Sequence, residues 1–167
     1  QIEAGQRSKR FAPTPLLPIL TRIEDVYAAV AEENGQTLAV TAAIHDTPVH
    51  DATVHDATVQ GDQQLLTQMI ANVVENALRH SPAGTRIELS LSHAPDGVRL
   101  DIADNGPGIP AGERDKVFDR FYRLEKSRTT PGNGLGLSMV KAIADLHGAT
   151  IGLQDNLPGL RVVIRFP

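Results

Sequence analysis

Cysteine is absent from this 167-residue chain. Disulfides and thiolate metal sites are therefore excluded. The chain also lacks a long hydrophobic run, since no apolar segment approaches the roughly 20 residues that cross a bilayer. Residues 1–10 are polar and basic, unlike the apolar centre of a secretory signal peptide. Because the first residue is Gln1 rather than methionine, we expect a piece of a longer protein.

The chain also has no excess of basic residues. The formal net charge is −4, which argues against nonspecific binding to nucleic acid or to an anionic membrane. We therefore expect no nucleic-acid partner. The content of 41% hydrophobic and 22% charged residues is typical of a soluble globular domain. The length suffices for one domain with a short extension.

A proline-rich segment near the N-terminus predicts a boundary. Phe11 is followed by Ala-Pro-Thr-Pro-Leu-Leu-Pro. Each proline removes a backbone donor and restrains the residue before it, so a helix cannot run through this segment. We place the start of the folded domain at Pro13.

Hydrophobic periodicity predicts the elements of the domain. Apolar residues at helical spacing mark residues 19–33, 63–80 and 135–147. Strands are predicted at residues 37–43, near Thr58, and at 86–92, 98–103, 150–154 and 160–166. Residues 86–92 and 98–103 form a hairpin, and a short helix is expected around Glu113 to Phe118. Mixed strands with helices on one face predict an α/β two-layer sandwich.

The helix predicted at residues 63–80 carries two stripes at about 100° per residue. The apolar stripe is Leu66, Ile70, Val73, Ala77 and Leu78. The polar stripe lies about 120° away and consists of Asn72, Asn76, Arg79 and His80. A neutral amide oxygen suits Mg²⁺, and basic side chains suit phosphate oxygens. The alternative is an ordinary solvated face.

Two glycine-rich loops follow. Asp104-Asn-Gly-Pro-Gly-Ile-Pro comes directly after a strand, where Gly106 and Gly108 permit close approach of a ligand. A carboxylate at that place can accept a hydrogen bond from the amine of adenine, although the loop can also be an ordinary tight turn. Pro131-Gly-Asn-Gly-Leu-Gly-Leu leads into a helix, and glycines before a helix N-terminus can bind an anion.

The order of these motifs resembles one family. Asn72-Val-Val-Glu-Asn76-Ala-Leu-Arg-His80, Asp104-Asn-Gly-Pro-Gly108, Phe118-Asp-Arg-Phe-Tyr-Arg123 and Gly132-Asn-Gly-Leu-Gly136 are similar to the N, G1, F and G2 boxes of sensor histidine kinases. That family belongs to the GHKL superfamily, with DNA gyrase, MutL and the large heat-shock chaperones. The resemblance covers residues 14–167 and implies the Bergerat ATP-binding fold.

The resemblance implies ATP and Mg²⁺ as cofactors and a role for each matching residue. Asn76 matches the Mg²⁺ ligand, and Asp104 matches the aspartate that reads adenine. Arg123 matches an arginine that reaches the γ-phosphate, so Asn76 and Arg123 are the expected catalytic residues. The expected nucleotide-binding residues are Asn72, Asn76, Arg79, His80, Asp104, Gly106, Gly108, Ile109, Phe118, Tyr122, Arg123, Gly132, Gly134, Leu135, Gly136 and Leu137. Phe118, Phe121 and Tyr122 resemble anchors of the lid, and core packing is the alternative for the two phenylalanines.

The resemblance also implies partners. Residues 1–12 resemble the end of a dimerisation helix and its linker, and residues 13–167 the catalytic domain. The γ-phosphate would pass to a histidine on the dimerisation domain, in cis or in trans, and then to a response regulator receiver domain. The parent protein would be a homodimer in the inner membrane, with this domain in the cytoplasm.

The family's phosphoacceptor motif is missing. His45, His50 and His55 each precede an aspartate in a five-residue repeat, but a period of five matches neither helix nor strand. We expect a solvated loop or strand there, with a phosphoacceptor or a metal site as the less favoured alternatives.

Other activities remain open. An ATP-driven clamp, an anti-sigma-type serine kinase and a pseudokinase would share these motifs. The clamps carry a water-activating glutamate one turn before the metal asparagine, where this chain has Asn72, which cannot act as a base. Glu75 points along another azimuth of the helix. The short lid with its F box favours histidine kinases over the serine kinases. No residue of the boxes is lost, which disfavours a pseudokinase.

Overall fold

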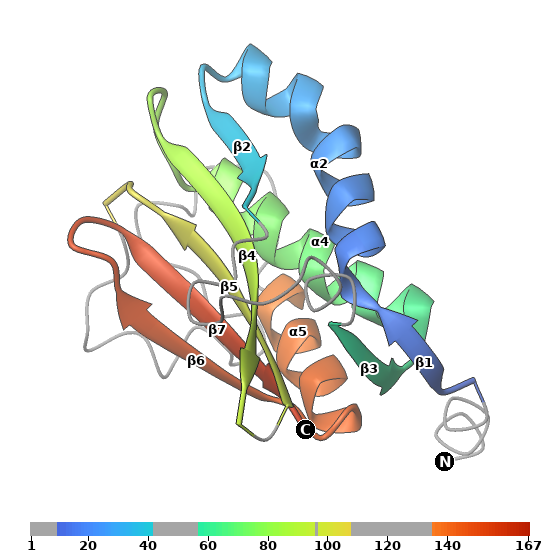
Figure 1. Cartoon of the computed structure of the whole chain (residues 1–167). Helices are drawn as coiled ribbons and strands as arrows, with labels where there is room; N and C mark the ends of the chain where they lie inside the picture. The colour runs from blue at the N-terminus through green and yellow to red at the C-terminus, as the bar shows by residue number, and fades with distance from the viewer. Residues whose placement is uncertain (1–9, 42–56, 96, 108–134) are drawn as a thin grey trace, which may run out of the picture.

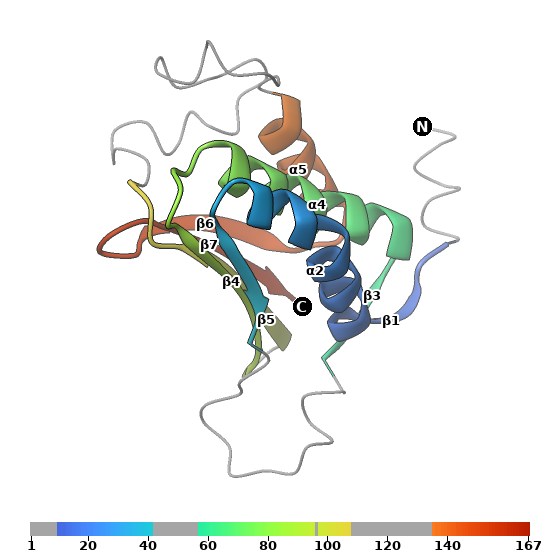
Figure 2. The ribbon, with the colours of Figure 1, turned by 90° about the horizontal axis from the view of Figure 1, so that it is seen from above.

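The computed structural model describes residues 10–41, 57–95, 97–107 and 135–167. These residues form a mixed β-sheet with a layer of helices (Figure 1). Helices α2 (Leu16–Glu33), α4 (Gln63–Arg79) and α5 (Leu135–Leu146) lie on the same side of the sheet when it is viewed from above (Figure 2). The predicted α/β two-layer sandwich is confirmed.

The main sheet has five strands in the order β2-β4-β5-β7-β6. β2 (Thr37–Val40) pairs parallel with β4 (Arg86–Ala94), and the other neighbours pair antiparallel. β4 and β5 (Gly97–Asp104) form the predicted hairpin. β6 (Thr150–Asp155) and β7 (Leu160–Phe166) form the predicted C-terminal pair. β5 is therefore the central strand, and its last residue lies between β4 and β7.

Helix α4 follows from its sequence. Asp62 begins it as the N-cap, where Oδ1 accepts hydrogen bonds from the N–H groups of Gln64 and Leu65 at 2.9 and 3.2 Å. Of the predicted apolar stripe, all members are buried except Ala77, which is half-buried. The buried residues of α4 are Leu66, Met69, Ile70, Val73, Val74 and Leu78.

The N-terminal proline segment differs from the prediction. Residues Ala12–Pro15 form strand β1, which pairs antiparallel with β3 (Thr58–Gly61). Proline is tolerated in a two-stranded ribbon because the outer edge needs no backbone donor. The strand predicted near Thr58 is confirmed. The domain boundary between residues 12 and 13 stays a prediction, although Ala12 pairs with Gly61 and the Phe11 ring stacks on His147.

Helix α2 begins at Leu16, three residues before the predicted start at Ile19. Pro18 therefore lies in the first turn, where its missing N–H would have no partner within the helix. The N–H of Leu16 instead donates to the carbonyl oxygen of Ala57 at 2.9 Å. This bond ties the start of α2 to the residue before β3.

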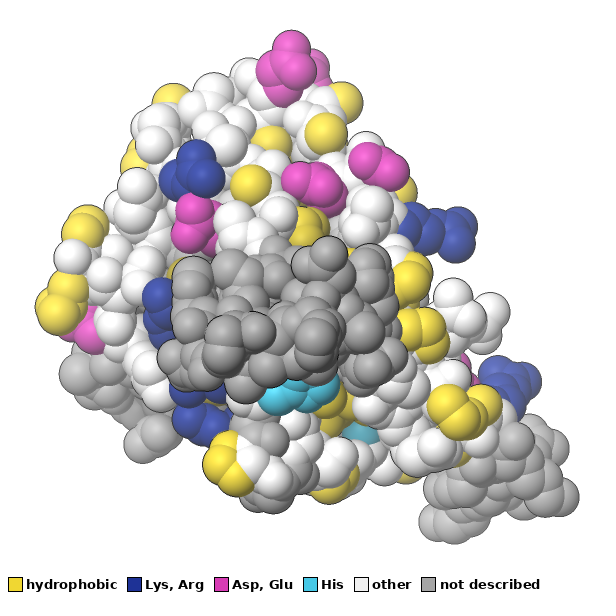
Figure 3. Space-filling model, in the orientation of Figure 1, with side chains coloured by type: hydrophobic (Ala, Val, Ile, Leu, Met, Phe, Trp, Pro, Cys, Tyr) yellow, Lys and Arg dark blue, Asp and Glu magenta, His cyan; other side chains and the backbone are white. Residues whose placement is uncertain are grey.

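Some predictions fall outside the described residues. These are the residues 42–43 of the predicted strand, the repeat from His45 to His55, and the short helix around Glu113 to Phe118. Within the described ranges, no helix is long and apolar enough to cross a membrane. On the face shown in Figure 3, lysine and arginine side chains of the described residues lie in separate groups among acidic and neutral ones.

Candidate functional site

The carboxylate of Asp104 faces the helix layer. Side chains alternate along a strand, so Asp104 lies on the same face as the buried Val98, Leu100 and Ile102. It is the last residue of β5, whereas the sequence predicts a strand that ends at residue 103, and only 8% of its surface is exposed. A carboxylate that is buried at the end of a central strand has lost most of its water and must find other partners.

The two carboxylate oxygens of Asp104 differ in their contacts. Oδ1 accepts hydrogen bonds from the N–H of Gly106 at 2.9 Å and from the N–H of Leu160 at 3.3 Å. No residue in the described part of the chain donates to Oδ2. Burial raises the pKa of Asp104, although the two N–H donors oppose this shift. Among the described residues, Oδ2 is therefore the oxygen of Asp104 that accepts no hydrogen bond.

Gly106 brings the loop after β5 against the end of α4. A Cβ atom at this position would lie 3.2 Å from Ser81 Oγ and 3.3 Å from Asp104 Oδ1. The absent side chain thus keeps open the space beside the Asp104 carboxylate. The structure thus brings the loop after β5 beside Ser81, the residue that follows the motif ending at His80.

Gln36 fixes the end of α4. Its side-chain amide donates to the carbonyl oxygen of Leu78, which the helix end leaves open, at 2.9 Å and to that of Ser81, just beyond the helix, at 2.7 Å. Gln36 is buried, and its Oε1 has no partner among the described residues. Gln36 could not be predicted from the sequence because it precedes β2 and belongs to no motif.

The polar stripe of α4 lies as predicted on the helix surface. Asn76 is half-buried, and no described residue makes a hydrogen bond to its side chain. Asn72 is also half-buried, and its Nδ2 lies 3.6 Å from Met139 Sδ on α5. No cluster of three or more His, Asp or Glu side chains suited to a metal occurs within the described residues. A metal at Asn76 would therefore depend on the ligand's own oxygens, as Mg²⁺ bound to nucleotides commonly does.

Arg79 pairs with an acidic neighbour. Its guanidinium donates to Glu75 Oε1 at 3.1 Å, and the Tyr27 hydroxyl on α2 donates to Glu75 Oε2 at 2.8 Å. Burial, followed by this hydrogen bond to Glu75, raises the pKa of Tyr27 to about 12. Both oxygens of Glu75 are thus engaged, one within α4 and one by α2. A phosphate would have to compete with Glu75 for Arg79, whose predicted role stays a prediction.

Some of the remaining predicted residues lie in the described part of the chain, and the others lie outside it. His80 is the C-cap of α4, and its backbone N–H donates to the carbonyl oxygen of Asn76 at 3.1 Å. Leu135 and Gly136 open α5, and Leu137 is half-buried against the core. The others lie outside the described residues: Gly108, Ile109, Phe118, Phe121, Tyr122, Arg123, Gly132 and Gly134.

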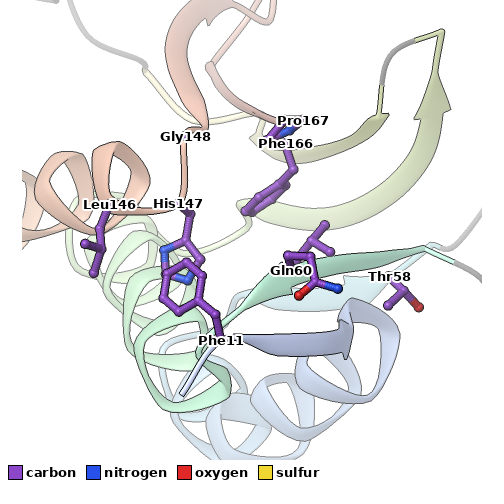
Figure 4. Close-up of a pocket in the computed structure, with 9 residues that line it drawn as sticks. Phe11, Thr58, Gln60, Leu146, His147, Gly148, Phe166 and Pro167 are labelled. Atoms are coloured by element: carbon purple, nitrogen blue, oxygen red, sulfur yellow. The ribbon is translucent and has the colours of Figure 1, made fainter. Parts of the chain in front are cut away.

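A hollow of about 610 Å³ lies elsewhere, where β1 and β3 meet the ends of α5 and β7 (Figure 4). The Phe11 ring stacks on the His147 ring there, with centroids 4.6 Å apart. His147 Nε2 accepts from the N–H of Asp62 at 3.1 Å, so its Nδ1 carries the proton towards the carbonyl oxygen of Ile143 at 2.8 Å. None of the predicted site residues lines this hollow. We therefore place the candidate site at the other end of β5, beside Asp104.

Known proteins resemble the chain in sequence. The family described as histidine kinase-, DNA gyrase B- and HSP90-like ATPase matches residues 61–167, more than half of the chain. Sensor protein kinase PmrB of Pseudomonas aeruginosa is 40% identical over 94 residues, which are 56% of this chain and 20% of PmrB. The histidine-protein kinase/phosphatase MprB of Mycobacterium leprae is 39% identical over 102 residues, which are 60% of this chain and 20% of MprB. The chain spans about a fifth of the length of these relatives.

Solved structures resemble the chain in fold. A mycobacterial sensor histidine kinase MprB superposes with a TM-score of 0.74 at 29% identity, covering 94% of this chain and 97% of that one. The ATP binding domain of PrrB from Mycobacterium tuberculosis gives 0.70 at 28% identity, covering 95% and 97%. The match to the family pattern and these likenesses agree with the resemblance found in the motifs. The chain therefore belongs to the histidine kinase-, DNA gyrase B- and HSP90-like ATPase family.

Proposed function

We propose that this chain is the ATP-binding catalytic domain of a sensor histidine kinase. The observation that carries the proposal is the Asp104 carboxylate, which is buried at the end of β5, with Gly106 beside Oδ1 and no donor to Oδ2 among the described residues. An acceptor at this place suits the exocyclic amine of adenine. Guanine presents a carbonyl oxygen there, and two facing acceptors would leave buried polar groups unpaired.

The residues present fit ATP and Mg²⁺. Asp104 would hold the base, and the cradle at Gly106 would be filled by any Cβ atom. Asn76 would supply one neutral oxygen ligand to Mg²⁺, with the phosphates supplying others. Bound Mg²⁺ would neutralise phosphate charge. Arg123 would add charge at the γ-phosphate, and the glycines at 132, 134 and 136 would pack against the phosphates.

The transfer itself needs positioning and charge neutralisation from this domain. The bond from the γ-phosphorus to the bridging oxygen breaks, a bond to an imidazole nitrogen forms, and ADP leaves. The imidazole would come from a dimerisation domain of the same protein, in cis or in trans. A response regulator receiver domain would then take the phosphoryl group. The parent would be a homodimer in the inner membrane with this domain in the cytoplasm.

An ATP-driven clamp is less well supported. Such an enzyme needs a carboxylate to activate water, and the polar stripe of α4 offers Asn72 at the expected position. Glu75, the carboxylate nearest in sequence, is engaged by Tyr27 and Arg79.

The proposal is tested by phosphotransfer with γ-labelled ATP. The chain alone is expected to bind Mg·ATP, to hydrolyse it very slowly and to label itself not at all. When a dimerisation domain that carries the acceptor histidine is added, the label should appear on that domain as an acid-labile, base-stable phosphoryl group. Strong labelling of the isolated chain, or fast turnover without the added domain, would show that the acceptor or the enzyme class is wrong.

Base recognition should depend on pH because of Asp104. Burial raises the pKa of this carboxyl, so protonation begins at a higher pH than for an exposed aspartate, which titrates near about 3.9. The protonated form loses the acceptor for adenine. The ratio of ADP to GDP affinity should therefore fall as the pH is lowered towards the raised pKa of Asp104, and the ratio cancels titration of the phosphates, which both nucleotides share. A ratio that stays constant down to the pH at which the chain begins to unfold would contradict the role of Asp104.

Protonation of Asp104 should affect the stability of the fold in the opposite direction from adenine binding. A folded-state pKa above the unfolded value means that the fold favours the protonated form. Lowering the pH past the pKa of Asp104 should therefore weaken adenine recognition. The protonation of Asp104 should not destabilise the nucleotide-free protein. Comparing thermal unfolding with binding over the same pH range separates the two effects.

A further inference from the structure

The turn between β6 and β7 is pressed against the end of β5. Gly159 has a φ of +109°, and a Cβ atom there would lie 1.9 Å from the carbonyl oxygen of Asp104 and 2.9 Å from Asn105 Cα. Only glycine permits both this conformation and this approach. The turn therefore forms one wall of the Asp104 site, although it is more than 50 residues away in the sequence.

Two contacts from this wall hold Asp104. The Leu160 N–H donates to Oδ1 at 3.3 Å. The Asn156 side-chain Nδ2 donates to the Asp104 main-chain oxygen at 2.8 Å. The first contact occupies one carboxylate oxygen, and the second fixes the backbone from which the carboxylate extends.

The amide of Asn156 is itself oriented. Arg161 Nη2 donates to Asn156 Oδ1 at 3.1 Å. Since a guanidinium can only donate, Oδ1 must face Arg161 and Nδ2 must face Asp104. The Asn156 N–H also donates to the carbonyl oxygen of Gly159 at 3.0 Å, which closes the turn.

Asp101 anchors Arg161 on the face of the sheet opposite the helices. Arg161 Nη1 donates to Asp101 Oδ2 at 2.6 Å, and Arg99 donates to both oxygens of Asp101 at 2.7 and 2.9 Å. Burial would raise the pKa of Asp101, but hydrogen bonds and charge from the two arginines lower it overall. The ionised carboxylate thus stays available to hold Arg161 in place.

We propose that Asn156, held by Arg161 and Asp101, is a positioning residue that sets the orientation of the Asp104 carboxylate and so sharpens the choice of adenine over guanine. This inference rests on the proposed function of Asp104. The chain Asp101–Arg161–Asn156–Asp104 runs from one face of the sheet to the base site. The N–H groups of Gly106 and Leu160 engage Oδ1, so Oδ2 is the oxygen left to meet the ligand.

The test measures ADP and GDP affinity by calorimetry, with thermal unfolding alongside. Asn156→Asp replaces the donor by an acceptor that faces the Asp104 carbonyl oxygen. ADP affinity should fall by about three- to tenfold, and the ADP to GDP ratio should fall with it. Arg161→Lys keeps a positive charge for Asp101 but leaves Asn156 unoriented, so it should reduce the ratio in the same direction. Because Arg161→Lys is the milder change, its affinities can be measured if Asn156→Asp does not fold.

Asp155→Ala is the matched control. Asp155 Oδ1 accepts from the N–H of Leu157 at 3.0 Å, so this change loosens the same turn without touching Asp104 or Asn156. It should leave the ADP to GDP ratio unchanged. An equal loss of selectivity in Asp155→Ala would show that a general loosening of the turn, rather than Asn156, is responsible, and would overturn the inference.

The roles of Asn156 and Asp104 can be tested separately. If Asp104→Asn loses ADP selectivity while Asn156→Asp and Arg161→Lys keep wild-type selectivity, the positioning role is wrong and the proposed function stands. If the wild-type chain binds ADP and GDP equally, the role of Asp104 is wrong, and the inference falls with it.

Discussion

Asp104→Asn is expected to weaken ADP binding by about 10- to 100-fold, as the loss of a charge-assisted hydrogen bond implies. The direction of the new amide is set by its surroundings. Oδ1 of the native side chain accepts from two backbone N–H groups, so the asparagine oxygen should take that place. The Nδ2 group then replaces Oδ2 and meets the adenine amine as donor against donor.

The same geometry predicts that Asp104→Asn binds guanine nucleotides more tightly than the wild-type chain does. Its carbonyl oxygen can accept from the new Nδ2 group, so GDP affinity should rise while ADP affinity falls. Stability of the nucleotide-free protein should stay the same or increase, because a buried charge is replaced by a neutral group that keeps both backbone hydrogen bonds. Calorimetry with both nucleotides and thermal unfolding measure these effects.

Asp25→Asn is the control for Asp104→Asn. Asp25 is exposed on α2 and belongs to no proposed contact. It should leave both affinities unchanged. Retention of wild-type ADP affinity in Asp104→Asn would remove the main support for the site.

Asn76→Ala should abolish most of the contribution of Mg²⁺ to nucleotide binding. The side chain is half-buried and has no hydrogen-bond partner among the described residues, so its removal breaks no observed bond. We expect the ratio of ADP affinity with Mg²⁺ to that in a chelator to fall by about 10- to 100-fold, the range seen when support of a metal site is lost. Affinity without Mg²⁺ should change little. Asn76→Asp should also impair transfer, because a carboxylate changes the ligand charge and repels the phosphates.

The control is Gln64→Ala, which removes an exposed amide from the same helix three turns earlier. It should keep the wild-type dependence on Mg²⁺. If Asn76→Ala and Asn76→Asp also keep it, and both transfer phosphate normally, Asn76 is not the metal ligand.

Local patterns predicted much of the fold. Alternation of Ile87, Leu89 and Leu91 with their neighbours predicted the β4–β5 hairpin, because a half-buried strand repeats every two residues. Helical spacing likewise predicted α4 and the stripe that includes Asn76. The position of Asp104 at a strand end followed from the same patterns.

Contacts that depend on strand order could not be predicted. Asn156 meets Asp104 only because β7 pairs with β5, and no local periodicity specifies which distant strands become neighbours. Gln36 likewise reaches Leu78 across 42 residues. Strand β1 was missed because Pro13 and Pro15 disfavour a strand, except in a ribbon whose edge needs no donor.

We expect the nucleotide to bind beside Asp104 rather than in the hollow at His147. Amide resonances of the chain labelled with ¹⁵N-glycine test it most directly, since Gly106 and Gly159 lie at the first place and Gly61 and Gly148 at the second. Addition of a non-hydrolysable ATP analogue with Mg²⁺ should shift the resonances of Gly106 and Gly159 and leave those of Gly61 and Gly148 in place. Shifts confined to Gly61 and Gly148 would contradict the account.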